Sequence, residues 1–336
     1  MVDNGTDPAE AKQTAEADAK ASKTFKETLD AYLAARIRTM KARSYAECKR
    51  HLENHWKPFH KRAVHEINTD MVADRLSEIE RAAGVVSRNR ARSTLSAMFA
   101  WAIGERFSKR LHINPVSGTL KADENKPRDR VLSDAELVTI WNATSNNDYG
   151  RIVRLLMLTG QRRDEIGSLR WSEIKGEHDP KKAVIELPAD RTKNSRGHEI
   201  PLSQMALDVL KAQAVLRDPD RDLMFGEGGG GYSGWSRSKA LLDDASGVKD
   251  WTLHDLRRTA ATRMADLGVQ PHIIEAVLNH VSGHKSGVAG IYNRSAYSIE
   301  KRSALKIWAN HMAIALAKAE GANVTTLRKR GGNSAR

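Results

Sequence analysis

The chain of 336 residues has a single cysteine and no long apolar run, and each absence excludes a class of protein. Because Cys48 is alone, no disulfide can form within the chain, which agrees with the reducing cytosol. No apolar run is long enough to cross a bilayer. Residues 1–21 also lack the apolar stretch of a secretory signal. We therefore expect a cytoplasmic protein without a membrane partner.

Signatures of cofactor and metal sites are incomplete as well. The glycine-rich stretch Gly226–Gly234 lacks the lysine and the serine or threonine of a nucleotide-binding P-loop, so it reads as a loop. His280 and His284 have no acidic or cysteine partner at zinc-ligand spacing. Cys48 shares a helical stripe with apolar residues, which favours packing over chemistry. We expect no cofactor and no metal.

Positive charge is present in excess and is unevenly placed. The net charge is +13 and the pI is about 9.8. Residues 1–22 carry two basic and five acidic side chains, whereas residues 23–115 carry 19 basic and 10 acidic ones. A basic protein in the cytosol plausibly meets a polyanion, of which nucleic acid is the commonest. The alternative is that the charge only maintains solubility.

The first half of the chain predicts a small helical bundle. Thr24 with Glu27 and Ser44 with Glu47 are capping-box pairs, and Pro58 ends the second helix. Further helices are expected over 69–83, with Gly84 as the C-cap, and over 88–106. Arg88, Arg90 and Arg92 at the start of the last helix either face DNA phosphates or form an ordinary solvated face.

The second half mixes helices with a small sheet. Ser133 with Glu136 opens a helix, a largely apolar helix over 149–158 stops at Thr159-Gly160, and Thr252 with Asp255 opens a third. Residues 183–187 and 198–202 read as two strands around a polar loop. The chain is thus predicted to be mainly α with a small β-sheet. We expect a lead-in (1–22), a helical domain (23–115), a linker (116–130), an α+β domain (131–318) and a basic, disordered tail (319–336).

Four fragments of the second half carry residues that suit phosphate chemistry. They are Thr159-Gly160-Gln161-Arg162 with Glu165, then Thr192-Lys193, then His254 with Arg257, and finally His280 with Tyr292 twelve residues later. A guanidinium binds two phosphate oxygens in a planar fork, and a helix N-terminus adds positive potential. Each fragment alone has an ordinary interpretation: a surface ion pair for Arg162 and Glu165, an exposed loop lysine, and a chance His-x-x-Arg.

The set, in this order, resembles the active site of the tyrosine recombinases, the phage and mobile-element integrases. The resemblance covers residues 23–318 and selects Arg162 over Arg163. It implies an N-terminal core-binding, SAM-like domain and a catalytic domain that together clamp duplex DNA. Asn279 stands where the family usually has glycine, and asparagine also tolerates the left-handed conformation.

The resemblance also implies the roles of these residues. Arg162 and Arg257 would bind the scissile phosphate, His254 and His280 would assist with protons and hydrogen bonds, and Glu165 would orient its neighbours. Lys193 would protonate the leaving 5′-oxygen, and Tyr292 would form a 3′-phosphotyrosine without metal or ATP. Tyr297 is the rival nucleophile. A final helix over 298–317 either packs on its own domain or, as is common in the family, docks on a neighbouring protomer.

The resemblance therefore implies a site-specific recombinase that acts on DNA attachment sites as a dimer or tetramer. Three other functions stay open at this point. A tyrosine-type topoisomerase would reseal the same strand, a catalytically inactive protein would only bind DNA, and a metal-dependent nuclease would lose activity in EDTA.

Overall fold

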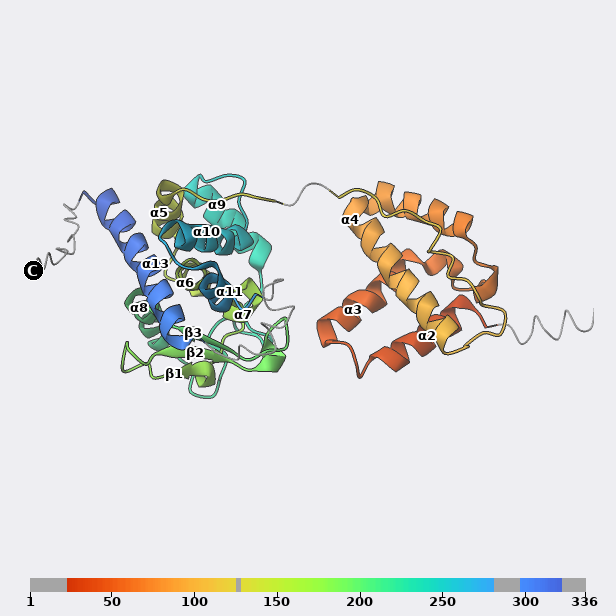
Figure 1. Cartoon of the computed structure of the whole chain (residues 1–336), viewed down its shortest axis with the longest axis horizontal. Coiled ribbons are helices and arrows are strands. Elements are labelled where there is room, and N and C mark those ends of the chain that lie inside the picture. Colours follow the sequence, from red (N-terminus) through yellow and green to blue (C-terminus); the bar gives the residue numbers. More distant parts are fainter. Residues whose placement is uncertain (1–22, 125–127, 281–296, 322–336) are drawn as a thin grey trace, which may run out of the picture. The chain divides into compact units, whose positions relative to one another are not determined.

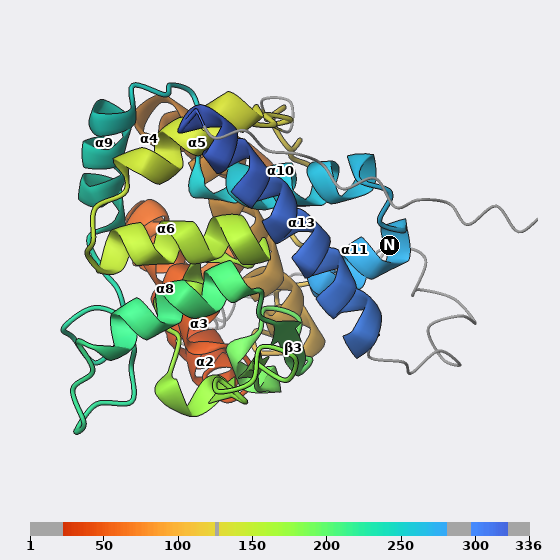
Figure 2. The same ribbon diagram turned by 90° about the vertical axis from the view of Figure 1, so that its left-hand side faces the viewer.

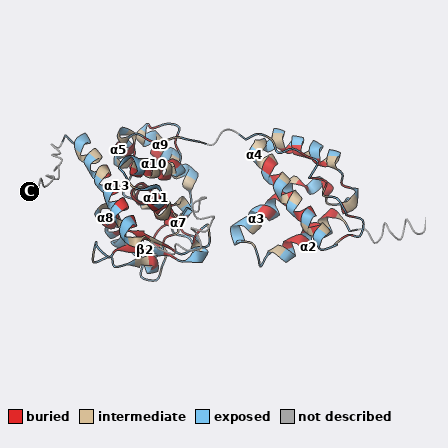
Figure 3. Cartoon of the chain, viewed as in Figure 1, coloured by how far each residue is buried: buried red, intermediate tan, exposed pale blue. Residues whose placement is uncertain are grey.

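The computed structural model describes residues 23–124, 128–280 and 297–321, and it divides into two compact units between Pro127 and Arg128 (Figure 1). We call residues 23–124 the N-terminal unit and the described residues from 128 onward the C-terminal unit. Each unit has its own hydrophobic core, with buried residues on the inner sides of its helices (Figure 3). The mainly helical fold predicted from the sequence is confirmed.

The N-terminal unit is a helical bundle. The helix that begins at Phe25 has the predicted capping box of Thr24 and Glu27. The next begins at Ala42, so Ser44 lies within its first turn and the predicted Ser44–Glu47 capping box is wrong. The helical elements are α2 (Phe25–Arg36), α3 (Ala42–Arg50), a π-helical turn (His51–His55), two 3-10 turns (Lys57–Phe59 and Val64–Glu66) and α4 (Thr69–Gly104).

The two helices predicted on either side of Gly84 follow each other directly as α4. Gly84 has φ 80° and ψ 168°, so the backbone leaves the helical conformation at this residue alone. Glycine adopts a positive φ without steric cost, which explains the break. The interruption lets both halves of α4 bury apolar residues, among them Leu76 and Leu95, in one core.

Two of the three arginines after Gly84 have structural partners within the unit. Arg88 pairs with Glu80 at 3.0 Å. Arg92 donates from Nη2 to the Thr119 carbonyl at 2.7 Å, and Asn89 donates to the Ala122 carbonyl at 2.8 Å. These bonds fix residues 116–122 of the expected linker against α4. Arg90, by contrast, is exposed.

The C-terminal unit combines helices with a small antiparallel sheet that lies at one edge of the unit (Figure 1). The sheet order is β1-β2-β3, with Ile185 of β2 opposite Ile174 of β1 and Ile200 of β3. Its elements are α5 (Asp134–Ala143), α6 (Asp148–Thr159), α7 (Arg163–Gly167), a 3-10 turn (Trp171–Glu173), β1 (Ile174–Lys175), β2 (Val184–Leu187), a 3-10 turn (Ala189–Arg191), β3 (His198–Pro201), α8 (Gln204–Ala214), α9 (Trp235–Ser246), α10 (Leu253–Asp266), α11 (Pro271–Val277) and α13 (Ser298–Ala319).

Most of these elements match the predicted ones, and the exceptions have physical reasons. Both predicted strands and the capping boxes of Ser133 and Thr252 are present. Strand β1 has only two residues, too few for an alternating pattern. Helix α9 begins after Gly234 without a side-chain cap, so it lacks the usual start signal.

Helix α13 packs on its own unit. It lies against α5, α6, α10, α11 and β3 (Figure 2). Trp308 is buried and donates from its indole nitrogen to the Met157 carbonyl at 2.7 Å, and Lys301 donates to the Glu199 carbonyl at 2.7 Å. The apolar side of this helix is therefore part of the core of its own unit. No helix in the described ranges is long and apolar enough to span a membrane.

Candidate active site

The first candidate arginine lies in the tight turn between α6 and α7. Helix α6 ends at Gly160, which has φ 64°, and Arg162 is the N-cap of α7. A Cβ at Gly160 would stand 3.1 Å from Cδ2 of Leu278. Both the positive φ and this close approach favour glycine. The turn thus brings Arg162 next to the C-terminal end of α11.

Arg162 is held by one carboxylate and one carbonyl. Its Nη1 donates to Oε1 of Glu165 at 2.8 Å, and its Nη2 donates to the Asn279 carbonyl at 3.4 Å. The Glu165 side chain is buried, while Arg162 keeps about a fifth of its side chain exposed. Its neighbour Arg163 lies over the ring of Trp235 instead, 4.9 Å from the centroid, and so points elsewhere. Glu165 is in position to orient Arg162.

The second candidate arginine, Arg257 of α10, is buried and bound by backbone carbonyls. Its Nη1 donates to the Gly160 carbonyl at 2.9 Å and its Nη2 to the Leu278 carbonyl at 2.7 Å. Burial, and then the positive charge of Arg162, lower the pKa of Arg257 to about 10. The guanidinium remains charged at neutral pH. Because the two arginines bind the adjacent carbonyls of residues 278 and 279, two cations meet at one turn.

His254 lies in the first turn of α10, three residues before Arg257, and is exposed. Partial burial of the ring, followed by the charges of Arg257 and Arg258, lowers the pKa of His254 below its usual value of 6.5. The imidazole is therefore neutral at pH 7 and can accept a proton.

The start of α10 is fixed by Asp255, which the sequence identified only as a cap. Its fully buried carboxylate accepts from the backbone nitrogen of Thr252 at 2.8 Å and from Nε of Arg128 at 2.8 Å, and it also pairs with Arg258. Burial raises the pKa of Asp255, but these hydrogen bonds outweigh it and the net pKa is lowered. The carboxylate stays ionised and anchors the helix that carries His254 and Arg257.

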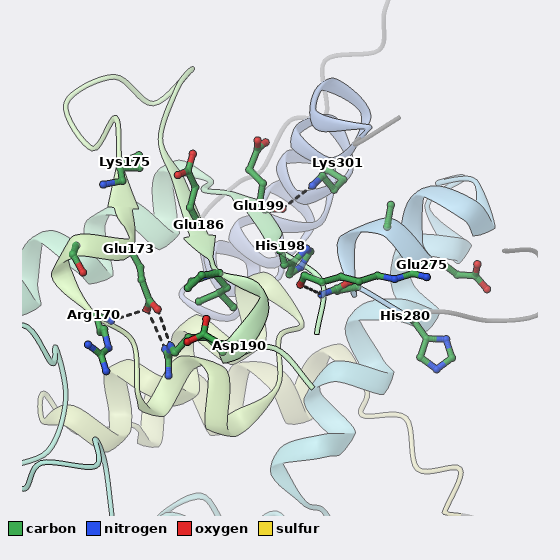
Figure 4. Close-up of a pocket in the computed structure, with 18 residues that line it drawn as sticks. Arg170, Glu173, Lys175, Glu186, Asp190, His198, Glu199, Glu275, His280 and Lys301 are labelled. Atoms are coloured by element: carbon green, nitrogen blue, oxygen red, sulfur yellow. Dashed lines mark hydrogen bonds and ion pairs between the residues drawn. The ribbon is translucent and has the colours of Figure 1, made fainter. Parts of the chain in front are cut away.

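Lys193 and His280 lie on two segments that contact each other. Lys193 is exposed in the loop between β2 and β3, and His280 is exposed just after α11. The adjacent residues are hydrogen-bonded, because Asn194 Nδ2 donates to the Asn279 carbonyl at 3.0 Å. Asn279 has φ 47°, the left-handed conformation expected of it. A cavity of about 820 Å³ opens beside these segments, and Figure 4 shows His280 at its edge.

His198 and Gln161 form a buried polar pair that no sequence motif indicates. Nε2 of His198 lies 3.2 Å from Oε1 of Gln161 and 3.0 Å from the Val277 carbonyl. Both partners are acceptors, so the neutral ring carries its proton on Nε2. Gln161 itself donates to the Val277 carbonyl at 2.9 Å. The pair ties β3 to the turn before Arg162 and to the end of α11, and nothing in the residue pattern indicated it.

The two candidate tyrosines have different outcomes. Tyr292, like His284, lies outside the described residues. Tyr297 is the N-cap of α13, and its ring packs against His272 with 5.5 Å between centroids. The structure therefore brings together Arg162, Glu165, His254 and Arg257, and places the segments of Lys193 and His280 in contact. Within the described ranges, no group of three or more His, Cys, Asp or Glu residues could hold a metal ion.

Comparison with known families gives one consistent assignment. Residues 130–298 match the phage integrase family and residues 25–119 match the phage integrase central domain. The chain belongs to the phage integrase family. The match to the phage integrase family contains every candidate residue from Arg162 to Tyr292. The match to the central domain lies within the N-terminal unit.

Among curated proteins, this phage integrase family member is similar to two prophage integrases of Escherichia coli K12. It is 32% identical to prophage integrase IntA over 165 residues, which are 46% of this chain and 36% of the relative. It is 26% identical to prophage integrase IntZ over 267 residues, which are 74% of this chain and 61% of the relative. The chain thus spans between about a third and three fifths of the length of these relatives.

Solved structures support the fold of this phage integrase family member. A lambda integrase dimer bound to a COC′ core site has a TM-score of 0.63 at 20% identity, covering 88% of this chain and 83% of that one. The Tn1549 transposon integrase in complex with a circular intermediate DNA has a TM-score of 0.62 at 16% identity, covering 78% of this chain and 93% of that one. At these identities the likeness establishes the fold.

Proposed function

We propose that this chain is a site-specific DNA recombinase that cleaves and rejoins DNA strands through a 3′-phosphotyrosine intermediate at Tyr292. One observation carries the proposal. Arg162 and Arg257 are held at the same turn by adjacent backbone carbonyls, and the carboxylate of Glu165 pairs with Arg162. Two cations and one anion leave the site with a net positive charge. The negative charge of a bound phosphodiester would neutralise it.

The candidate residues divide the chemistry of one transesterification among them. The phenolic oxygen of Tyr292 forms a bond to phosphorus as the bond from phosphorus to the 5′-oxygen breaks. Arg162 and Arg257 neutralise the charge that builds on the non-bridging oxygens. Neutral His254 accepts the phenolic proton, His280 donates a hydrogen bond to the phosphate, and Lys193 protonates the leaving 5′-oxygen. Reversal of the step by a 5′-hydroxyl from another strand gives recombination.

The partners follow from the same proposal. The solved structures of similar fold include a lambda integrase dimer on a core site, a lambda integrase tetramer on a Holliday junction and a transposon integrase on circular intermediate DNA. By analogy, we propose that this chain binds double-stranded attachment sites of a mobile element in the cytoplasm and self-associates on them. The basic N-terminal unit would also bind the DNA.

Covalent trapping tests the chemistry. Nicked duplexes taken from the junctions between the element that encodes the chain and the surrounding chromosome are incubated with wild type, Tyr292→Phe and Tyr297→Phe. Wild type and Tyr297→Phe should form a covalent protein–DNA adduct that survives denaturing electrophoresis, and Tyr292→Phe should form none. An undiminished adduct with Tyr292→Phe contradicts the assignment.

The same material separates the alternatives. Two matched intact duplexes should yield crossed products with a recombinase, whereas a tyrosine-type topoisomerase would only relax or reseal each duplex. Absence of both an adduct and strand cleavage with wild type would leave a DNA-binding protein without activity. Strand cleavage that forms no adduct and is abolished by EDTA would indicate a metal-dependent nuclease instead.

A further inference from the structure

Helix α11 ends in a turn that asparagine completes in an unusual way. The backbone nitrogen of His280 donates to the Glu275 carbonyl at 2.9 Å, and that of Asn279 donates to the Ala276 carbonyl at 3.3 Å. This is the double hydrogen bond of a Schellman turn, whose left-handed residue is most often glycine. Asn279, with φ 47°, occupies that position. Glycine would adopt this left-handed conformation with less strain. The asparagine side chain therefore points to a second role at this position.

That side chain forms a reciprocal bridge to the loop between β2 and β3. Asn194 Nδ2 donates to Oδ1 of Asn279 at 2.9 Å and to the Asn279 carbonyl at 3.0 Å. In return, Nδ2 of Asn279 lies 3.3 Å from Oδ1 of Asn194. We call these contacts the asparagine bridge. Glycine at position 279 could keep only the contact to the carbonyl.

Both ends of the asparagine bridge are attached to fixed structure. Oδ1 of Asn194 also accepts from the Thr192 hydroxyl at 3.2 Å and from the backbone nitrogen of Arg196 at 3.3 Å, so Asn194 organises its own loop. The Asn279 carbonyl also accepts from Nη2 of Arg162 at 3.4 Å. The bridge therefore joins the loop beside Lys193 to the carbonyl that positions Arg162.

We propose that Asn194 and Asn279 are positioning residues that hold the Lys193 loop against the turn bearing His280, so that the lysine reaches the leaving oxygen of the DNA. The inference rests on the proposed function. Lys193 immediately precedes Asn194 in the chain, and His280 immediately follows Asn279. Displacing a catalytic group by about 1 Å can cost up to ~100-fold in rate, so a contact that sets the loop position has a kinetic effect.

A sulfur-substituted substrate distinguishes this role from simple fold stabilisation. When the bridging 5′-oxygen of the scissile phosphate is replaced by sulfur, the leaving group is a thiolate, which departs without a proton because thiols are much stronger acids than alcohols. A defect in delivering the proton therefore slows cleavage of the oxygen substrate and leaves cleavage of the sulfur substrate unaffected. A defect in binding the phosphate slows cleavage of both.

The test compares cleavage rates of oxygen and sulfur nicked duplexes from the element junctions. Asn279→Gly keeps the left-handed turn and removes the side-chain half of the bridge. It should slow cleavage of the oxygen substrate by about tenfold, part of the ~100-fold or more that a general acid contributes, and leave the sulfur substrate within about twofold of wild type. Arg257→Lys is the matched control and should slow both substrates.

Asn194→Ala removes the bridge from the other side and keeps the test decisive if one variant folds poorly. The double variant should be no slower than about the slower single one, because both changes break the same contact. Equal slowing on both substrates, or an oxygen rate unchanged in Asn279→Gly, overturns the positioning role. Failure of the proposed function is distinct, since wild type would then form no adduct with either substrate.

Discussion

At the scale of single residues, backbone carbonyls hold the two arginines. Arg257 is bound by the carbonyls of Gly160 and Leu278, and Arg162 by that of Asn279. A short turn and a helix end supply all three acceptors, so the spacing of the guanidinium groups is set by how these two segments pack. The carboxylate of Glu165 adds a direct constraint on Arg162.

His198 predicts a pH dependence of stability at the same scale. Burial, and then the charge of Lys301, lower the pKa of His198 to about 3, whereas an unfolded histidine titrates near 6.5. As pH falls below 6.5 the unfolded chain takes up this proton and the folded chain does not. The contribution of His198 is thus complete above pH 6.5 and is lost as pH falls, by about 3 kcal/mol at pH 4.

His198→Gln isolates this effect because the amide can donate where Nε2 does but does not titrate. Urea unfolding at pH 7, 6, 5 and 4 should show the wild type losing more free energy of unfolding than the variant toward low pH. Parallel curves would contradict the prediction. The N-terminal unit holds its own buried histidine, His51, whose pKa burial lowers to about 4, and this background is common to both proteins.

The sequence indicates candidate residues of the site but not the contacts that hold them. The resemblance to the tyrosine recombinases selects Arg162, Glu165, His254 and Arg257, and the structure places them together. The hydrogen bonds of Arg257 could not be predicted, because every residue has a backbone carbonyl and the sequence does not show which of them accepts. The pair of Gln161 and His198 was missed for a related reason, since a buried hydrogen bond joins residues that are 37 positions apart.

At the scale of elements, capping residues located the starts of several helices. Helices α2, α5 and α10 begin with a serine or threonine and an acid three residues later, and all three were found. Helix α3 begins at Ala42 with no side-chain cap, so its start was misplaced, and α9 was missed after Gly234. The residue pattern therefore located the starts of the helices that have a capping box at their N-terminus.

Helix α13 gives a prediction at this scale. Trp308 is 1% exposed in the core of the C-terminal unit, and its neighbour Ile307 is 39% exposed. Trp308→Ala should lower the free energy of unfolding by about 4 kcal/mol through cavity formation, while Ile307→Ala, the matched control, should cost less than about 1 kcal/mol. Equilibrium urea unfolding measures both. If α13 instead served mainly to join protomers, Trp308→Ala would impair assembly on DNA without lowering the stability of the single chain.

At the scale of the whole molecule, charge is the property that bears on the proposed binding of DNA. The chain carries a net charge of +13. In the N-terminal unit, Arg88 forms an ion pair and Arg92 forms hydrogen bonds. Arg90, by contrast, is exposed in a surface hollow that Lys121, Glu47 and Glu124 also line. Of the three arginines whose role the sequence left open, Arg90 is thus the best placed to meet a phosphate.

Salt dependence tests this reading. Binding to a duplex of arbitrary sequence should weaken by at least about a hundredfold between 50 and 200 mM NaCl, because each phosphate contact releases counterions. Arg90→Glu should weaken binding and reduce the slope of log K against log salt, and Arg90→Lys should keep both near wild type. Fluorescence anisotropy measures the affinities. A slope that Arg90→Glu leaves unchanged would place the DNA contacts elsewhere.

The way Arg257 is bound has a consequence for genetic screens of inactive variants. Its two acceptors belong to the main chain at positions 160 and 278, and a codon change cannot delete a peptide oxygen. Loss-of-function alleles that disturb this clamp should therefore fall on the arginine codon itself, or on Gly160, where a new side chain would strain the left-handed backbone and crowd Leu278.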